Sequence, residues 1–310
     1  MGVKADMARS GRYMWSEMRR RTLQGKIAWT GLLFVAPWIL GAALFFVYPL
    51  ARSLILSVSE IENLKTFELN LVGLKWYHEA FFADVEFVPS LLSVSIDNLV
   101  NLPLINIFAL IVALLLNKNI KARGLFRSIF FLPVLLGTGF IMQQLLGQDI
   151  SGDAVGFARG LLIPDQLTAY IGQSGVNLIQ SFLDRLTLVM WNSGVQILIY
   201  LSALQTISPT LYEAAKVDSA SEWESFWLIT LPMLAPMIQL NLVFTVIATF
   251  SMADNTVLEF IQWLAFETAE ANAYEYSCAV GLIYCVFVLL VIGVIVLLTR
   301  RFVDNAKEGG

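Results

Sequence analysis

Six stretches of the chain carry no charged side chain, and each is long enough to cross a membrane as a helix. They cover residues 27–51, 98–117, 128–148, 186–212, 225–253 and 276–299. In lipid every backbone polar group must be satisfied within the protein, which favours helices. We therefore expect an all-α integral membrane protein with six transmembrane helices, at about 28–52, 93–117, 128–148, 184–207, 228–253 and 276–299. A seventh uncharged window, 166–183, is rich in Gln, Gly, Ser and Asn, and we interpret it as loop or interfacial structure.

Composition excludes several classes of protein. Apolar residues make up 57% of the 310 residues and charged residues only 14%, whereas soluble domains carry about 25% charge. The net charge of −4 argues against a nucleic-acid binder. The sequence has one histidine and two cysteines, with no phosphate-binding loop and no metal-binding cluster. The chain therefore lacks the groups needed to hydrolyse ATP or to bind a metal, and energy for uphill movement of a solute has to come from another chain.

The distribution of charge predicts the orientation. Seven basic residues precede the first window, four lie between the second and third, and three follow the last. Segments 59–89 and 254–275 are acidic. Because basic segments stay in the cytoplasm, we expect cytoplasmic tails at 1–26 and 303–310 and a membrane domain at 27–302. One segment departs from the basic bias. Four windows precede 213–224, which places this segment in the cytoplasm, yet it holds one lysine and four acidic residues.

Polar residues recur at helical spacing in two of the windows. Asn192 and Gln196 are four residues apart, and Thr245 and Thr249 repeat this spacing in the next window. Such stripes either hydrogen-bond neighbouring helices or line a pathway for a neutral, hydroxyl-rich solute. We expect the four residues to face a shared aqueous cavity, so that leucine at these positions impairs transport more than assembly. Failure of assembly alone would favour the first alternative.

The unusual cytoplasmic segment has signals for two short helices. Ser208-Pro209 is a typical helix start, and a helix over about 209–217 should end at Asp218-Ser219. Either Ser219, with Glu222, or Ser221, with Glu224, then offers the capping box of a second helix.

Three runs in this segment resemble the EAA motif of ABC importer permeases: Glu213-Ala214-Ala215, Asp218-Ser219-Ala220 and Ile229-Thr230-Leu231-Pro232. The motif's glycine is Ser219 here, which leaves open whether the turn differs or the serine caps the next helix. Residues 34–41, 72–77 and 124–133 resemble sugar permeases of the maltose and glycerol-3-phosphate type, on the first-permease side. The "LTxGGP" of those permeases is absent, and residues 252–255 stand in its place.

The resemblance implies a transmembrane subunit of an ATP-driven importer, which forms half of a pathway for a carbohydrate or similar polar solute. Its partners would be a second permease, ATPase subunits that bind ATP and Mg²⁺, and an extracellular solute-binding protein. The chain itself would need no cofactor, would not be an enzyme, and would lie in a bacterial or archaeal cell (inner) membrane. Residues 213–220 would form a coupling helix and its turn in a groove of the ATPase, with Glu213 facing a basic group and Ala214 and Ala215 permitting close packing.

Other functions stay open. An ATP-independent secondary transporter would move solute alone and depend on an ion, but the chain lacks a buried relay of ionisable groups. An ABC permease for a non-sugar solute, such as polyamines or phosphate, fits the sugar-type segments less well. An integral membrane enzyme lacks catalytic groups. The sequence does not name the solute.

Overall fold

The chain is mostly helical, as expected. The computed structural model describes residues 30–63, 68–118, 124, 165–252, 255–268 and 272–308. Within these residues one two-stranded sheet departs from the all-α prediction. The chain divides into two compact units, one formed by Met1–Trp76 with Ala271–Ala279 and the other by Tyr77–Glu270 with Val280–Gly310.

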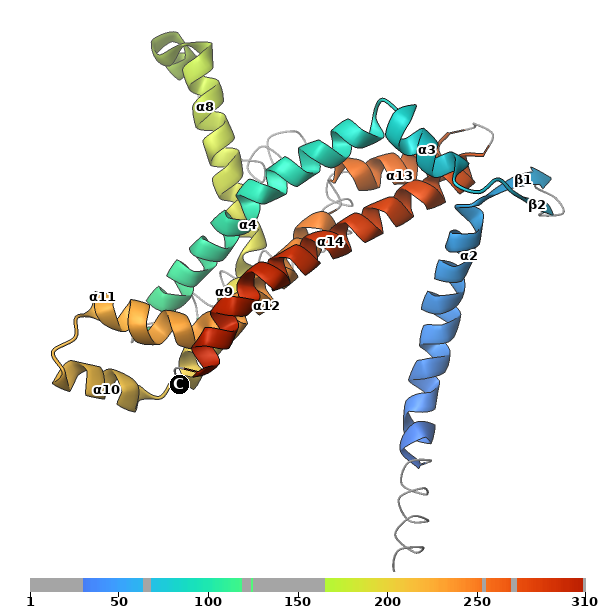
Figure 1. Ribbon diagram of the computed structural model, residues 1–310. Helices are drawn as coiled ribbons and strands as arrows, with labels where there is room; N and C mark the ends of the chain where they lie inside the picture. Colours follow the sequence, from blue (N-terminus) through green and yellow to red (C-terminus); the bar gives the residue numbers. More distant parts are fainter. Residues whose placement is uncertain are drawn as a thin grey trace, which may run out of the picture. The chain divides into compact units, whose positions relative to one another are not determined.

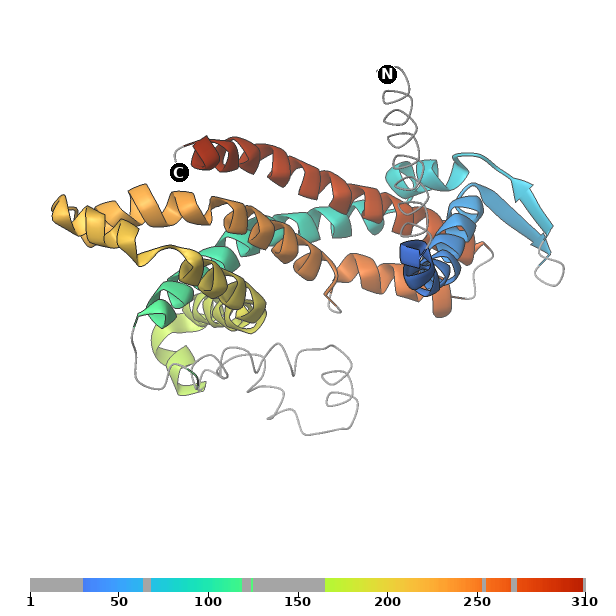
Figure 2. The ribbon, with the colours of Figure 1, turned by 90° about the horizontal axis from the view of Figure 1, so that it is seen from below.

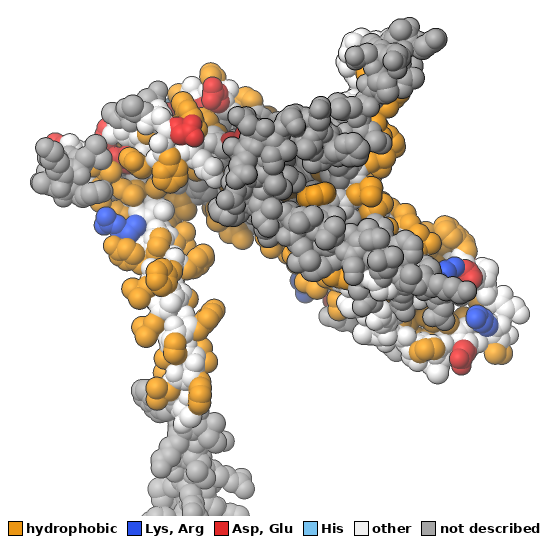
Figure 3. All heavy atoms as spheres, turned by 180° about the vertical axis from the view of Figure 1, so that it is seen from behind, with side chains coloured by type: hydrophobic (Ala, Val, Ile, Leu, Met, Phe, Trp, Pro, Cys, Tyr) orange, Lys and Arg blue, Asp and Glu red, His pale blue; other side chains and the backbone are white. Residues whose placement is uncertain are grey.

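The first unit begins with an apolar helix, Thr30–Leu56, of 27 residues. It includes a short wide turn, η1 (Ala43–Val47), and ends in α2 (Tyr48–Leu56). Large apolar side chains are exposed along it, with Phe34 and Phe45 each 83% exposed, and Figure 3 shows them on both sides of the helix. Exposed apolar side chains over this length are what a helix in contact with lipid requires.

A β-hairpin follows this helix. Strands β1 (Ser59–Asn63) and β2 (Glu68–Leu71) pair antiparallel, with Ser59 opposite Leu71 and an irregularity in β1 between Ile61 and Asn63. Trp76 is buried and donates from Nε1 to the Ser59 carbonyl at 2.9 Å. This bond ties the segment after β2 to the start of β1.

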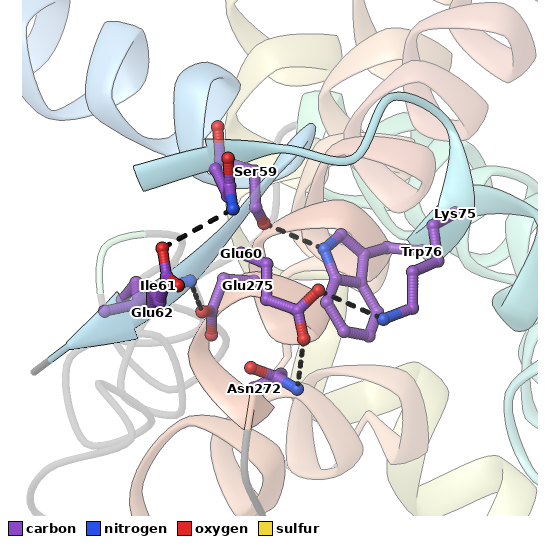
Figure 4. A network of polar contacts seen from close by, with 9 residues as sticks. Ser59, Glu60, Ile61, Glu62, Lys75, Trp76, Asn272 and Glu275 are labelled. Carbon is purple, nitrogen blue, oxygen red and sulfur yellow. Dashed lines mark hydrogen bonds and ion pairs between the residues drawn. The ribbon is translucent and has the colours of Figure 1, made fainter. Parts of the chain in front are cut away.

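Two residues near the start of α14 (Ala273–Glu308) hold the hairpin (Figure 4). Glu275 is 1% exposed, and its Oε1 accepts the Ile61 backbone N–H at 2.7 Å. Asn272 donates from Nδ2 to Glu60 Oε1 at 3.0 Å, and Lys75 lies 3.2 Å from Glu60 Oε2. The buried Glu275 side chain is thus hydrogen-bonded to a backbone amide of β1, as a buried polar group requires.

The other helices follow in chain order (Figure 1): α3 (Lys75–Phe82), α4 (Phe87–Asn117), α8 (Asp165–Asn192), α9 (Gly194–Thr206), α10 (Pro209–Val217), α11 (Glu222–Ser225), the wide turn η2 (Phe226–Thr230), α12 (Leu231–Phe250) and α13 (Thr256–Phe266). Helix α4 packs against α9 and α12, and Figure 2 shows these helices side by side. Their shared core contains Ala109, Val112 and Leu116 from α4, Ile197 and Leu201 from α9 and Leu234 from α12. Small residues such as Ala109 let the helices approach closely.

Four helices among the described residues are long and apolar enough to cross a membrane: Thr30–Leu56, Phe87–Asn117, Glu222–Phe250 and Ala273–Asn305. A fifth candidate is a pair bent by 54°, Gly172–Asn192 with Gly194–Thr206. The window at 128–148 lies outside the described residues.

The loop alternative for 166–183 is wrong, because α8 (Asp165–Asn192) runs through this window as helix, whereas the interfacial alternative stays a prediction. Its polar residues Gln173, Asn177 and Ser181 are spaced by four, so they occupy one face. The neighbouring Leu178 and Phe182 supply exposed apolar surface. Gly172, with φ of 72°, marks a break inside the helix that glycine adopts without strain.

Candidate functional site

A cavity of about 420 Å³ lies in the second unit, where α4, α8 and the end of α12 meet. Its lining is mostly polar and uncharged: Ser93, Asn98, Asn101, Ser181, Thr249, Asn255 and Thr256, with Val94, Leu188 and Met252 as apolar members and Asp97 and Arg185 as charged ones. The volume lies within the range of small-molecule sites. Amides and hydroxyls of this kind both donate and accept hydrogen bonds, which suits a ligand rich in hydroxyl groups.

Asp97 and Arg185 form an ion pair in the wall of this cavity. Arg185 Nη2 lies 3.4 Å from Asp97 Oδ1, and the two side chains are 38% and 60% exposed, respectively. The pair connects α8 to α4. At such exposure it contributes at most about 1 kcal/mol to stability.

A second polar cluster is buried between α4, α9 and α12. Thr245 is fully buried, and its Oγ1 accepts from Asn106 Nδ2 and from Gln196 Nε2, each at 3.2 Å. The same hydroxyl donates to the Asn241 carbonyl at 2.7 Å, and Tyr200 donates to Asn106 Oδ1 at 3.2 Å. Thr245 is therefore a shared hydrogen-bonding centre for three helices.

Three buried amide oxygens have no hydrogen-bond partner within the described part of the chain. They are Oδ1 of Asn101, beside the cavity, and Oε1 of Gln196 and Oδ1 of Asn241, in the buried cluster. An unsatisfied buried acceptor costs about 1–3 kcal/mol. A hydroxyl group or a water molecule beside Asn101 would relieve that cost.

The four residues expected to share a cavity occupy three environments. Thr249 lines the cavity. Gln196 and Thr245 are bonded to each other in the buried cluster. Asn192 is half-buried and donates to the Leu188 carbonyl of its own helix at 3.0 Å.

Helix α10 has the bounds that the sequence predicts, Pro209–Val217. Its hydroxyl cap does not form, because the Ser208 hydroxyl bonds that of Thr210 at 2.7 Å and reaches no backbone amide. At its end the Ala220 N–H donates to the Ala215 carbonyl and the Ser219 N–H to the Lys216 carbonyl, at 2.9 and 3.1 Å. These two hydrogen bonds together define a Schellman turn. Ser219 has a φ of 62°, so it keeps the left-handed conformation that glycine usually supplies.

Ser221, rather than Ser219, caps the second short helix. Its Oγ accepts the Glu224 N–H at 3.2 Å, and Glu224 Oε2 accepts the Ser221 N–H at 2.7 Å. Both halves of the capping box are therefore formed. Of the residues in the EAA-like motif, Glu213, Ala214, Asp218 and Ser219 are exposed, and Ala215 and Ala220 are half-buried.

One side chain links α10 to the helix that follows. The Tyr212 hydroxyl lies 2.9 Å from Oγ1 of Thr230, in the wide turn that leads into α12. Tyr212 also packs against the shared core of α4, α9 and α12. Tyr212 therefore connects α10 to both the core and the turn that leads into α12.

Sequence reasoning missed the role of Arg185 in the cavity wall. A signal was present, since Asp97 and Arg185 each immediately precede an uncharged window. If both windows cross the membrane in the same direction, the two residues lie at the same level. Only their packing, however, makes them neighbours.

Comparison with known proteins identifies the class. The family model for the binding-protein-dependent transport system inner membrane component matches residues 86–307. The lactose transport system permease protein LacF of Rhizobium radiobacter is 30% identical over 234 residues, which cover 72% of this chain and 74% of LacF. The arabinooligosaccharides transport system permease protein AraP of Bacillus subtilis (strain 168) is 28% identical over 284 residues, 84% of this chain and 85% of AraP.

A solved structure has the same fold. It is a bacterial ABC transporter involved in the import of the acidic polysaccharide alginate, with a TM-score of 0.60, 20% sequence identity, and coverage of 93% of this chain and 99% of that one. The long apolar helices and these matches define a membrane-embedded transport subunit, not an enzyme. The chain belongs to the family of binding-protein-dependent transport system inner membrane components. It is a multi-pass permease of an ABC transport system.

Proposed function

We propose that this chain forms half of the pathway of an ATP-driven importer for a carbohydrate or similar polar solute. An extracellular binding protein delivers the solute, a second permease completes the pathway, and ATPase subunits supply the energy. The sugar class is supported by the names of LacF and AraP. It is also supported by the lining of the cavity, where polar uncharged side chains predominate.

The coupling role of α10 rests on one observation, its connection to the membrane helices. The helix presents Glu213 and Ala214 to solvent, while Tyr212 on the same helix contacts Thr230 and the core. An ATPase that grips the exposed residues would therefore move the start of α12. Asp218, Ser219 and Ala220 shape the turn that sets the direction of this helix.

We propose that Thr249 contacts the solute in the pathway. Asn192, Gln196 and Thr245 then act on transport through the packing of the helices that surround the cavity. A secondary transporter has no use for an exposed docking helix of this kind, and the family to which the chain belongs makes that alternative the weaker one.

The test uses Ala215→Trp and Glu213→Lys, with Ala215→Ser and Glu213→Gln as matched controls. Overpacking costs about 1–3 kcal/mol, roughly a five- to hundredfold loss of affinity. The charge reversal should weaken docking most at low salt. Co-purification of the ATPase subunits and solute-stimulated ATP hydrolysis are measured together. If Ala215→Trp and Glu213→Lys each keep full co-purification of the ATPase and full solute-stimulated ATP hydrolysis, α10 is not the coupling element.

We further propose six spans with both tails, 1–26 and 303–310, in the cytoplasm and a permease domain at 27–302. A cysteine at Glu267 should react with a membrane-impermeant maleimide in intact cells. A cysteine at Ala122 should react only after permeabilisation. Reaction of the Ala122 variant in intact cells would reverse the orientation.

A further inference from the structure

The charges in the cavity wall cancel. Among the described residues that line it, Asp97 is the one acid and Arg185 the one base, and they lie 3.4 Å apart. Each extends from a different helix, Asp97 from α4 and Arg185 from α8. The cavity therefore carries two opposite charges that neutralise each other, surrounded by hydroxyls and amides.

Stability does not explain the pair. Both side chains are substantially exposed, and exposed ion pairs contribute little to folding. Neither residue is part of the hydrophobic core formed by α4, α9 and α12. The ion pair matters more for a solute than for stability. An unpaired charge in the cavity would attract ions of opposite sign and repel those of like sign.

The guanidinium of Arg185 is a group that binds carboxylates well, since its planar fork matches two carboxylate oxygens. Here one of its nitrogens, Nη2, lies 3.4 Å from Asp97 Oδ1. A solute carboxylate that binds the guanidinium would therefore lie beside the negative charge of Asp97. A sugar hydroxyl meets no such repulsion, and it can bond either member of the pair without separating them.

We propose that the Asp97–Arg185 pair sets the charge selectivity of the cavity and makes it a site for uncharged saccharides. This proposal rests on the assignment of the cavity to the solute pathway. Asp97 blocks the arginine against acidic sugars, and Arg185 neutralises the aspartate. Loss of Asp97 should leave a cavity that prefers anions, and loss of Arg185 should leave one that prefers cations.

Two serines offer matched reporters of the charge in the cavity. Ser93 lies four residues before Asp97 on α4, and Ser181 lies four residues before Arg185 on α8, so each shares a helix face with its charged neighbour. Both line the cavity. Each is replaced by cysteine after Cys278 and Cys285, the only native cysteines, have been changed to serine.

Labelling rates are measured in membrane vesicles that contain the chain with its partner subunits. The probes are an anionic and a cationic methanethiosulfonate, the sulfonatoethyl and trimethylammonium-ethyl reagents. Asp97→Asn should raise the anionic-to-cationic rate ratio roughly threefold to tenfold at low salt, and Arg185→Gln should lower it by a similar factor. The double variant should return to the ratio of the parent. Unchanged ratios in both single variants, or reporters that no reagent reaches, would overturn the proposal.

Protection from labelling tests the class of solute. Glucose should slow labelling of the parent and of Asp97→Asn alike, whereas glucuronate should protect only Asp97→Asn. Protection of the parent by glucuronate would contradict the proposed selectivity. The coupling test on α10 is independent of this result, because it measures ATPase docking. A chain that passes that test but fails this one is an importer subunit whose selectivity lies elsewhere.

Discussion

The turn between α10 and α11 and the buried cluster around Thr245 differ in how far apart in the sequence their bonded residues lie. The turn between α10 and α11 is held by bonds between residues at most five positions apart, such as the Ala220 N–H to the Ala215 carbonyl. The buried cluster around Thr245 is held by bonds across 49 and 139 positions. Geometry in the first region follows from neighbouring residues, whereas geometry in the second exists only after three helices have packed.

This difference predicts where substitutions act. In the buried cluster one changed side chain leaves partners on other helices unsatisfied, and the whole unit responds. At the turn between α10 and α11 a changed residue alters only local opening. The variants below test this division, from the largest expected effect to the smallest.

Thr245→Leu should destabilise the chain by about 2–4 kcal/mol. It removes the oxygen that accepts from Asn106 and Gln196, and each orphaned buried donor costs about 1–3 kcal/mol. Thermal unfolding of the purified protein measures the loss. Thr245→Ser keeps the hydroxyl and should lose less than about 1 kcal/mol.

Thr249→Val tests whether a threonine that lines the cavity differs from Thr245 in the buried cluster. The Thr249 hydroxyl donates to the Thr245 carbonyl of its own helix at 2.8 Å and lines the cavity. We expect a stability change below about 1 kcal/mol together with a fall in solute uptake. Equal destabilisation by Thr245→Leu and Thr249→Val would erase the distinction between the buried cluster and the cavity.

Ser219→Gly should stabilise the α10 turn by about 1–2 kcal/mol, because the left-handed conformation costs an L-residue that much. Ser219 has the φ of 62° that glycine adopts freely. Hydrogen exchange of the Ser219 and Ala220 amides should slow roughly five- to thirtyfold. Ser219→Ala, which keeps a Cβ, should not slow it, and faster exchange in the glycine variant would contradict the assignment of the strain.

Ser221→Ala should destabilise the start of α11 by about 1 kcal/mol, the usual cost of a lost N-cap. The Ser221 hydroxyl accepts the Glu224 amide, so exchange of that amide should quicken about fivefold. Ser221→Asp retains an acceptor and serves as the control. A global loss of thermal stability in Ser221→Ala would show that this cap is not a local feature.

Sequence predicted the exposed region well because its signals are contiguous. Pro209 fixes the start of α10, and Ser219 sits where the motif has glycine. Ser208 is the N-cap residue of α10, as the sequence predicts, but its hydroxyl bonds that of Thr210 instead of a backbone amide. The choice between Ser219 and Ser221 as cap needed backbone geometry, which a list of residue types does not contain.

The membrane region was predicted less completely. The long apolar windows indicated helices, but composition alone did not separate helix from loop at 166–183, which is helical. The polar residues spaced by four were recognised, but Asn192 ends α8 and Gln196 lies in α9. Whether Thr245 meets Gln196 or a cavity depends on helix rotation. The pairing of Asp97 with Arg185, 88 positions apart, likewise requires the packed structure.

The Glu275 carboxylate has a consequence for the order of synthesis. Its partner, the Ile61 amide, lies 214 positions earlier in the chain. At about 5–20 residues per second, the ribosome needs roughly 10–40 s to make the intervening chain. During that interval β1 has an unpaired edge amide, of the kind that templates pairing with other strands. Synthesis of the first turn of α14 therefore supplies the partner for a strand edge that was made near the beginning of translation.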